Sequence, residues 1–264
     1  MSGMLGLGFM QKAFLAGAII SIVLSLMSFF VVLRGMSFIG VGIAHSALGG
    51  IALGVLAGVD PRWTAIVFCV AVANLITYTS RKGALQEDAV IGIFFSLTMA
   101  AGIILIGLSK AYSVDLFGYL FGNILAVSNE DLWLAAGVGL LVLASAGVFF
   151  KELLMDSFDR ELALASGIPV KSLDHLMASL IALTVVISVK LVGIVLASAL
   201  LVIPGATALR LTARWQRMLG ISLVAALLAT FGGLSLAYFF DLAPGASIAV
   251  VSSALFFLSF LRKS

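Results

Sequence analysis

The residues Met36-Ser-Phe-Ile-Gly-Val-Gly-Ile-Ala-His45-Ser-Ala-Leu-Gly-Gly-Ile-Ala-Leu-Gly54 form an apolar, glycine-rich run that is long enough to cross a bilayer as a helix. The one titratable side chain in this run is His45. An ionisable group at bilayer depth costs free energy, so His45 is a candidate functional residue. The run also indicates the fold class, because similar runs recur along the whole chain.

The composition of the chain is that of a membrane protein. Of its 264 residues, 62% are hydrophobic and 10% are charged. A soluble domain of this length could not cover so much apolar surface, so lipid has to cover much of it. The basic residues lie in short connections between apolar runs, which gives no indication of a nucleic acid partner. A single cysteine excludes a disulfide framework and a cysteine-rich metal cage.

We therefore expect an all-α, polytopic membrane protein with a single transmembrane domain over residues 1–264 and about nine spans, within a range of eight to ten. The expected spans cover residues 12–33, 36–58, 62–80, 89–109, 132–150, 173–190, 192–211, 218–240 and 246–261. With the N-terminus outside and the C-terminus in the cytoplasm, eleven Lys and Arg residues lie in inner connections and four in outer ones. This distribution follows the positive-inside rule.

The stretch near 113–128 is apolar but short, and it contains Asp115 and Asn123. A full span here would move the basic connection 151–171 to the outside, against the charge rule. We expect a re-entrant or outer-surface helix, with a tilted tenth span as the alternative. Asp115 is then either a pathway acid or an interfacial helix cap, because polar groups at this depth must face protein or water.

The longest polar interruption runs from Lys151 to Pro169 and predicts a short amphipathic helix on the cytoplasmic surface. Asp156 or Ser157 can cap this helix, and Gly167 with the following proline ends it. Its small residues would let another protein dock closely. A plain solvated loop helix is the alternative.

Two features predict how the helices pack. Every fourth position of one face of the second span is small, which lets a neighbouring helix approach closely. These residues are Gly42, Ser46, Gly50, Gly54 and Gly58. Pro204 removes a backbone donor from the seventh span and predicts a kink there.

His45 cannot form a metal site alone. Neutral imidazole binds zinc and other first-row metals. The chain has two histidines and one cysteine, so a metal at His45 needs water, Asp115, a carbonyl group or His45 of a second copy. So poor a ligand set suits an ion that binds in passing and leaves, rather than a permanent cofactor. The alternative is a buried histidine that only bonds to a neighbouring carbonyl.

Sequence motifs spread over nearly the whole chain match those of a known protein family. They lie at residues 31–40, 44–46, 114–122, 126–131, 157–167, 190–193, 199–207 and 244–245. Together they resemble the permease subunits of bacterial zinc, manganese and iron ABC importers, with most similarity to the zinc permeases.

The resemblance implies import of a divalent transition metal across the bacterial inner membrane, with Zn²⁺ as first cargo and Mn²⁺ or Fe²⁺ as alternatives. It implies P-loop ATPase subunits in the cytoplasm, an extracytoplasmic metal-binding protein and a second permease copy in a homodimer. It also makes 152–169 the segment that couples to the ATPase. The coupling residues would be Phe158, Asp159, Glu161, Ala163 and Gly167.

The chain itself has no P-loop, so we expect a transport subunit without catalytic residues. The family usually carries an aspartate four residues before the histidine, where this chain has Val41. An acid there would share a helix face with His45, and its loss favours a nitrogen-tolerant ion such as zinc. A stand-alone secondary carrier or channel is the alternative, although such proteins normally hold more intramembrane acids.

Overall fold

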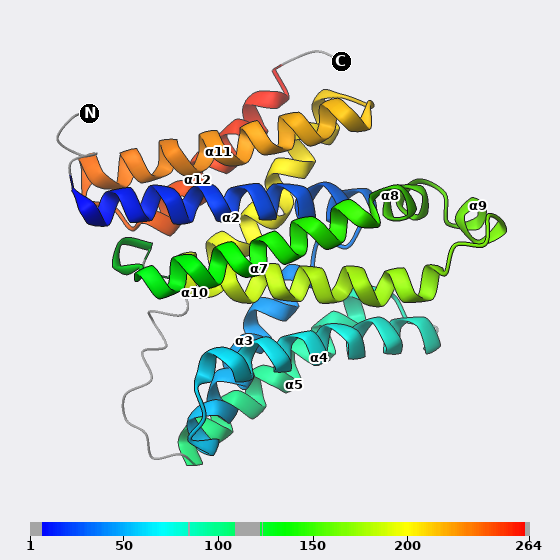
Figure 1. Ribbon diagram of the computed structural model, residues 1–264, viewed down its shortest axis with the longest axis horizontal. Coiled ribbons are helices and arrows are strands. Elements are labelled where there is room, and N and C mark those ends of the chain that lie inside the picture. The colour runs from blue at the N-terminus through cyan, green and yellow to red at the C-terminus, as the bar shows by residue number, and fades with distance from the viewer. Residues whose placement is uncertain (1–6, 84, 109–121, 123, 262–264) are drawn as a thin grey trace. The chain divides into compact units, whose positions relative to one another are not determined.

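The computed structural model describes residues 7–83, 85–108, 122 and 124–261, and these residues form helices without any strand (Figure 1). The elements are α2 (Gly8–Leu33), α3 (Ile39–Ala57), α4 (Pro61–Lys82), α5 (Glu87–Leu108), the 3-10 turn η1 (Ile124–Ala126), α7 (Asn129–Val148), α8 (Phe150–Phe158), α9 (Arg160–Ala165), α10 (Val170–Leu211), α11 (Trp215–Phe240) and α12 (Pro244–Ser259). The predicted all-α membrane fold is confirmed.

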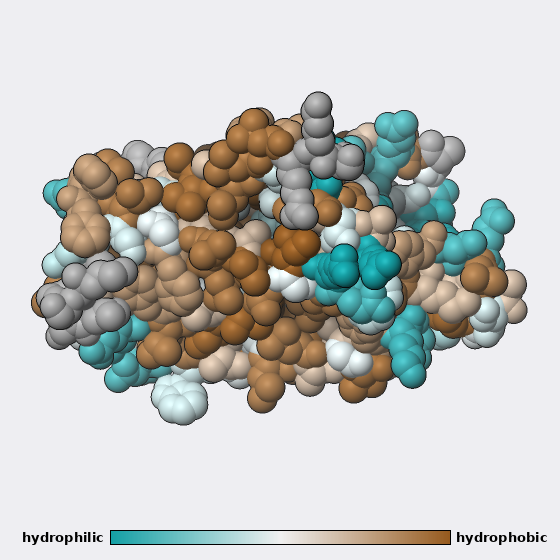
Figure 2. Space-filling model, turned by 90° about the horizontal axis from the view of Figure 1, so that it is seen from above, coloured by the Kyte–Doolittle hydropathy of each residue, from teal (hydrophilic) through white to brown (hydrophobic). Residues whose placement is uncertain are grey.

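In the described part of the chain, seven helices are long and apolar enough to cross a membrane, and α12 is a shorter apolar helix. Figure 2 shows that apolar side chains cover most of one face of the molecule. Large apolar side chains such as Leu97, Leu140 and Phe257 are exposed, and lipid is the solvent that suits them. Of the helix expected near 113–128, the structure describes Gly122 and residues 124–128, which include η1; the rest, with Asp115 and Asn123, lies outside the described residues.

Each of the nine expected spans corresponds to a helix, but two of them lie within α10. The break between these two is Gly193, whose φ of 84° and ψ of 168° are not helical. The pattern indicates Pro204 as the irregular point of this region, whereas in the structure Pro204 lies inside helical backbone. Gly193 breaks the helix because its dihedral angles lie in a region that is essentially open to glycine alone. A milder bend at Pro204 stays a prediction.

The chain forms two compact units. The first comprises residues 1–35, 117–149 and 187–264, and its centre is α2, which packs against α7 and α11. Small polar side chains join α2 to other helices of this unit: Ser21 bonds to Thr230 of α11 at 2.6 Å, and the Ser28 hydroxyl accepts the Gly205 N–H of α10 at 2.8 Å. Bonds of this kind are a common way to join helices in lipid. The prediction of a single domain is not tested by this division.

The second unit comprises residues 36–116 and 150–186. Its centre is α3, which packs against both α4 and α5. The unit also contains α8, α9 and the first part of α10. The helix that carries His45 and the predicted coupling segment are thus parts of one compact unit.

The break at Gly193 gives a stability prediction. We expect Gly193→Ala to lower the free energy of unfolding by about 1–3 kcal/mol, because a Cβ is strained at this positive φ. Thermal unfolding in detergent micelles measures the effect. Gly137→Ala is the control, since Gly137 lies within helix α7 and a Cβ there would meet no atom of the described residues within 4 Å. Equal melting temperatures for both variants would contradict the prediction.

Candidate functional site

The small-residue face of α3 brings two other helices close to the candidate site. A Cβ on Gly42 would lie 2.6 Å from the Ile91 side chain of α5, and one on Gly50 would lie 2.7 Å from Cα of Ala65 in α4. Gly54 is equally constrained, because its Cβ would lie 2.8 Å from Cα of Pro61. These distances leave no room for a side chain, so the face packs first on α5 and then on α4.

The other two members of this face have different roles. Ser46 is fully buried and bonds through its hydroxyl to Thr98 of α5 at 2.8 Å. A Cβ on Gly58 would meet nothing within 4 Å in the described part of the chain, so packing does not require a glycine there. Gly58 instead ends α3 in the left-handed region, with φ of 67°. Glycine at this position is the usual way to end a helix.

His45 lies one helical turn beyond Val41 and is half-buried. Its Nδ1 atom is 2.9 Å from the Val41 carbonyl oxygen. Because a carbonyl only accepts, Nδ1 carries the proton of the neutral ring, which leaves the lone pair on Nε2. The ring also packs edge-on against Phe95 of α5, with centroids 4.8 Å apart. A bond of this kind orients a metal-binding histidine, and it equally satisfies a structural one.

A cavity of about 260 Å³ opens beside the first turns of α3 and α5. Its lining residues are Phe38, Val41, Gly42, Asp88, Ile91, Gly92 and Phe95. Phe95 also contacts His45, so the cavity lies next to the histidine. Asp88 is the acidic residue of this lining, whose surface is otherwise almost entirely apolar, and Val41 lies where the sequence resemblance leads us to expect an acid.

Asp88 was not among the residues expected from the sequence. The signal was the acidic pair of Glu87 and Asp88 directly before a span. Within the described ranges, no three His, Cys, Asp or Glu side chains lie close enough together to hold a metal ion. The described part of the chain therefore contains no preassembled metal cage, and His45 and Asp88 can only bind an ion together with other ligands.

The predicted coupling segment consists of two short helices, α8 and α9. The cap of α9 is Asp159, whose side chain accepts the Leu162 N–H at 2.9 Å. The expectation that Asp156 or Ser157 caps this helix is wrong, because α8 continues through both residues. Asp159 has extended backbone, with φ of −149°, and that conformation frees its carboxylate for the cap.

Large apolar side chains are exposed on the predicted coupling segment, among charged and polar ones. Phe158 is 58% exposed and Leu164 is 55% exposed, although both lie in a polar connection. Glu161 is also exposed, and Gly167 follows α9 in the left-handed region, with φ of 79°. Ala163 is fully buried, so this expected contact residue is not available on the surface of the chain.

The chain shares its sequence and fold with known proteins. A family model described as "ABC 3 transport family" matches residues 7–263. The manganese transport system membrane protein MntC of Halalkalibacterium halodurans is 38% identical over 97% of this chain and 88% of MntC. The high-affinity zinc uptake system membrane protein ZnuB of Haemophilus influenzae is 33% identical over 95% of this chain and 96% of ZnuB. The solved structure of PsaBC from Streptococcus pneumoniae in complex with Fab has a chain that is 39% identical, with a TM-score of 0.87 over 98% of this chain and 93% of that one.

The close helix contacts give a second prediction. We expect Gly50→Val to lower the melting temperature, because the added atoms would collide with backbone atoms of α4. Overpacking of this kind typically costs about 1–3 kcal/mol. Gly107→Val is the control, since Gly107 lies on α5 with no atom of the described residues within 4 Å of its Cβ position. Thermal unfolding compares the two, and a Gly50→Val protein as stable as the control would contradict the packing argument.

Proposed function

The chain belongs to the ABC 3 transport family, and we propose that its cargo is a divalent transition metal ion, with Mn²⁺ as the first candidate. It is the membrane permease of a metal-importing ABC transporter, in which a separate subunit hydrolyses ATP. It acts with that ATPase and with a substrate-binding protein. The further elements of the proposal are the cargo, the route past His45, a homodimeric arrangement and an outside N-terminus in the bacterial inner membrane.

Sequence similarity supports manganese. The relative named for manganese transport is 38% identical to this chain, and the relative named for zinc uptake is 33% identical. Asp88 is one of the residues that line the cavity beside His45, and carboxylate oxygen is a ligand that suits Mn²⁺. We therefore place Mn²⁺ before the zinc cargo that the sequence resemblance favours.

Zinc is the second candidate cargo, because the ligands at His45 suit it. His45 offers an imidazole nitrogen, and the Val41 side chain offers no oxygen beside it. For any fixed nitrogen and oxygen ligands, Zn²⁺ binds more tightly than Mn²⁺. A permease that selects Mn²⁺ must then rely on the geometry of its other ligands or on the protein that delivers the ion.

The proposed route runs along α3. With the N-terminus outside, α3 and α5 both begin at the cytoplasmic side, so the cavity with Asp88 lies nearer the cytoplasm than His45. An ion released from His45 would meet this carboxylate on its way in. Two weak binding sites, at His45 and Asp88, suit transport, because an ion that binds too tightly at one site cannot leave.

Removing the imidazole tests the route. In proteoliposomes with the ATPase and the binding protein, we expect His45→Ala to lower metal uptake roughly tenfold or more, since even outer-shell changes cost metal sites 10–100-fold. Elemental analysis of the vesicle contents measures uptake. Leu53→Ala, a change at an exposed position of the same helix, is the control and should leave uptake unchanged. Wild-type uptake by His45→Ala would refute a role for His45 in the route.

Restoring the missing acid tests the cargo. Val41→Asp places a carboxylate one turn before His45, on the same helix face. We expect the ratio of Mn²⁺ to Zn²⁺ uptake to rise severalfold when both ions compete at equal concentration, because an oxygen ligand favours the harder ion. Val41→Asn, which adds a neutral polar group of the same size, is the control. An unchanged ratio in Val41→Asp would show that this position does not select the ion.

A further inference from the structure

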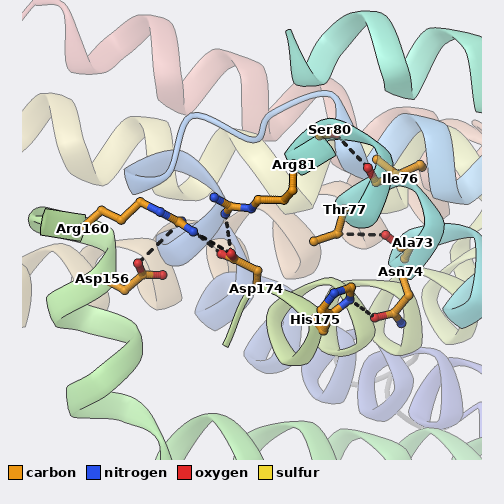
Figure 3. Close-up of polar contacts among 10 residues, drawn as sticks. All are labelled: Ala73, Asn74, Ile76, Thr77, Ser80, Arg81, Asp156, Arg160, Asp174 and His175. Carbon is orange, nitrogen blue, oxygen red and sulfur yellow. Dashed lines mark hydrogen bonds and ion pairs between the residues drawn. The ribbon is translucent and has the colours of Figure 1, made fainter. Parts of the chain in front are cut away.

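A buried carboxylate at the start of α10 binds two arginines from different elements (Figure 3). Arg160 of α9 donates from Nη1 to Oδ1 of Asp174 at 3.2 Å and from Nη2 to Oδ2 at 2.8 Å. Arg81, in the last turn of α4, places Nη2 2.5 Å from the same Oδ2. The Asp174 side chain is only 4% exposed, so its charge depends on these partners.

The bond between Arg160 and Asp174 is two-pronged, which fixes its orientation as well as its distance. Arg160 also lies 3.7 Å from Asp156 of α8. The hydrogen bond to Asp174 raises the pKa of Arg160, so the guanidinium stays charged. The two helices of the coupling segment are thus joined to α10 and, through Asp174, to α4.

A second set of bonds joins α10 to α4 farther from the end of α4. His175 Nδ1 lies 2.8 Å from Asn74 Oδ1, and Asn74 donates to the Ser179 hydroxyl at 2.9 Å. Figure 3 shows Asn74 and Arg81 on one helix, both directed toward the start of α10. With two attachments about two turns apart, this half of α4 and the start of α10 should move together.

The helix α4 in turn contacts α3, which carries His45. The Cys69 thiol donates to the Ile43 carbonyl at 3.6 Å, and Ala65 packs against Gly50 without room for a methyl group. Such tight packing does not deform gradually, so a shift of α4 has to move α3. Contacts therefore continue from α9 through Asp174 and α4 to the proposed metal route.

We propose that Asp174 is the positioning residue that transmits movement of the coupling segment to α4 and so to α3. This inference rests on the proposed function, because it requires an ATPase that moves α8 and α9. Separating Asp174 from its arginines would leave a buried carboxylate without a cation, which is costly. The cluster therefore holds α4, α9 and α10 in one orientation. Without the bonds of Asp174 to Arg160 and Arg81, movement of α8 and α9 would not be passed on to α4 and α3.

The test separates coupling from assembly. In the complete transporter in proteoliposomes, we expect Asp174→Asn to keep the ATPase bound and its basal ATP hydrolysis unchanged. The metal imported per ATP hydrolysed should fall about tenfold, which is within the usual range of coupling between two sites. Asp60→Asn is the matched control: Asp60 is an exposed cap of α4, and asparagine caps helices equally well.

Two further variants keep the inference falsifiable if Asp174→Asn fails to fold. Asp174→Glu keeps the charge and should restore part of the import per ATP. Arg160→Lys keeps the charge of the other partner but loses the two-pronged bond, so it should lower import per ATP without releasing the ATPase. Wild-type import per ATP in Arg160→Lys or in folded Asp174→Asn would overturn the inference, and so would release of the ATPase by a folded Asp174→Asn protein. Absence of metal import by the wild-type transporter would instead refute the proposed function.

Discussion

The close approach of α3 to its neighbours is the constraint on which the second unit depends. Lipid provides no hydrophobic drive that would bring two apolar helices together, so contact surface and polar bonds have to do so. The glycines at 42 and 50 remove the side chains that would hold α5 and α4 away. The buried bond between Ser46 and Thr98 then holds α3 on α5. The positions of His45, Phe95 and the cavity follow from this contact.

The candidate site combines weak ligands with a fixed orientation. The Val41 carbonyl orients the His45 ring, and Phe95 supports its edge. The nearby acidic residue, Asp88, is exposed on the first turn of α5 and is one of the residues that line the cavity. A storage or structural metal site would need more ligands held rigidly, whereas a transported ion must bind and leave. The arrangement therefore suits passage rather than retention.

The predicted coupling segment and the helix with His45 belong to one compact unit, although 94 residues lie between them in sequence. The ionic cluster around Asp174 and the bonds around Asn74 connect them through α4. Charged joints of this kind add little to stability, because burying the charges costs about as much as their attraction returns. They fix instead the orientation of α8 and α9 relative to α4 and α10, which the proposed transmission of movement requires.

The sequence by itself determined the membrane class and nearly every helix and made His45 a candidate functional residue, because hydrocarbon thickness and the cost of a buried imidazole are local constraints. It also predicted a short helical segment between the fifth and sixth spans, where α8 and α9 lie, since a polar interruption among apolar runs favours a place outside the bilayer. Asp88, Asp174 and the break at Gly193 could not be predicted in this way. The partners of Asp174 come from residues 81 and 160, and no local pattern connects them. Only tertiary packing decides which carboxylate is removed from water and therefore needs a cationic partner, as Asp174 does.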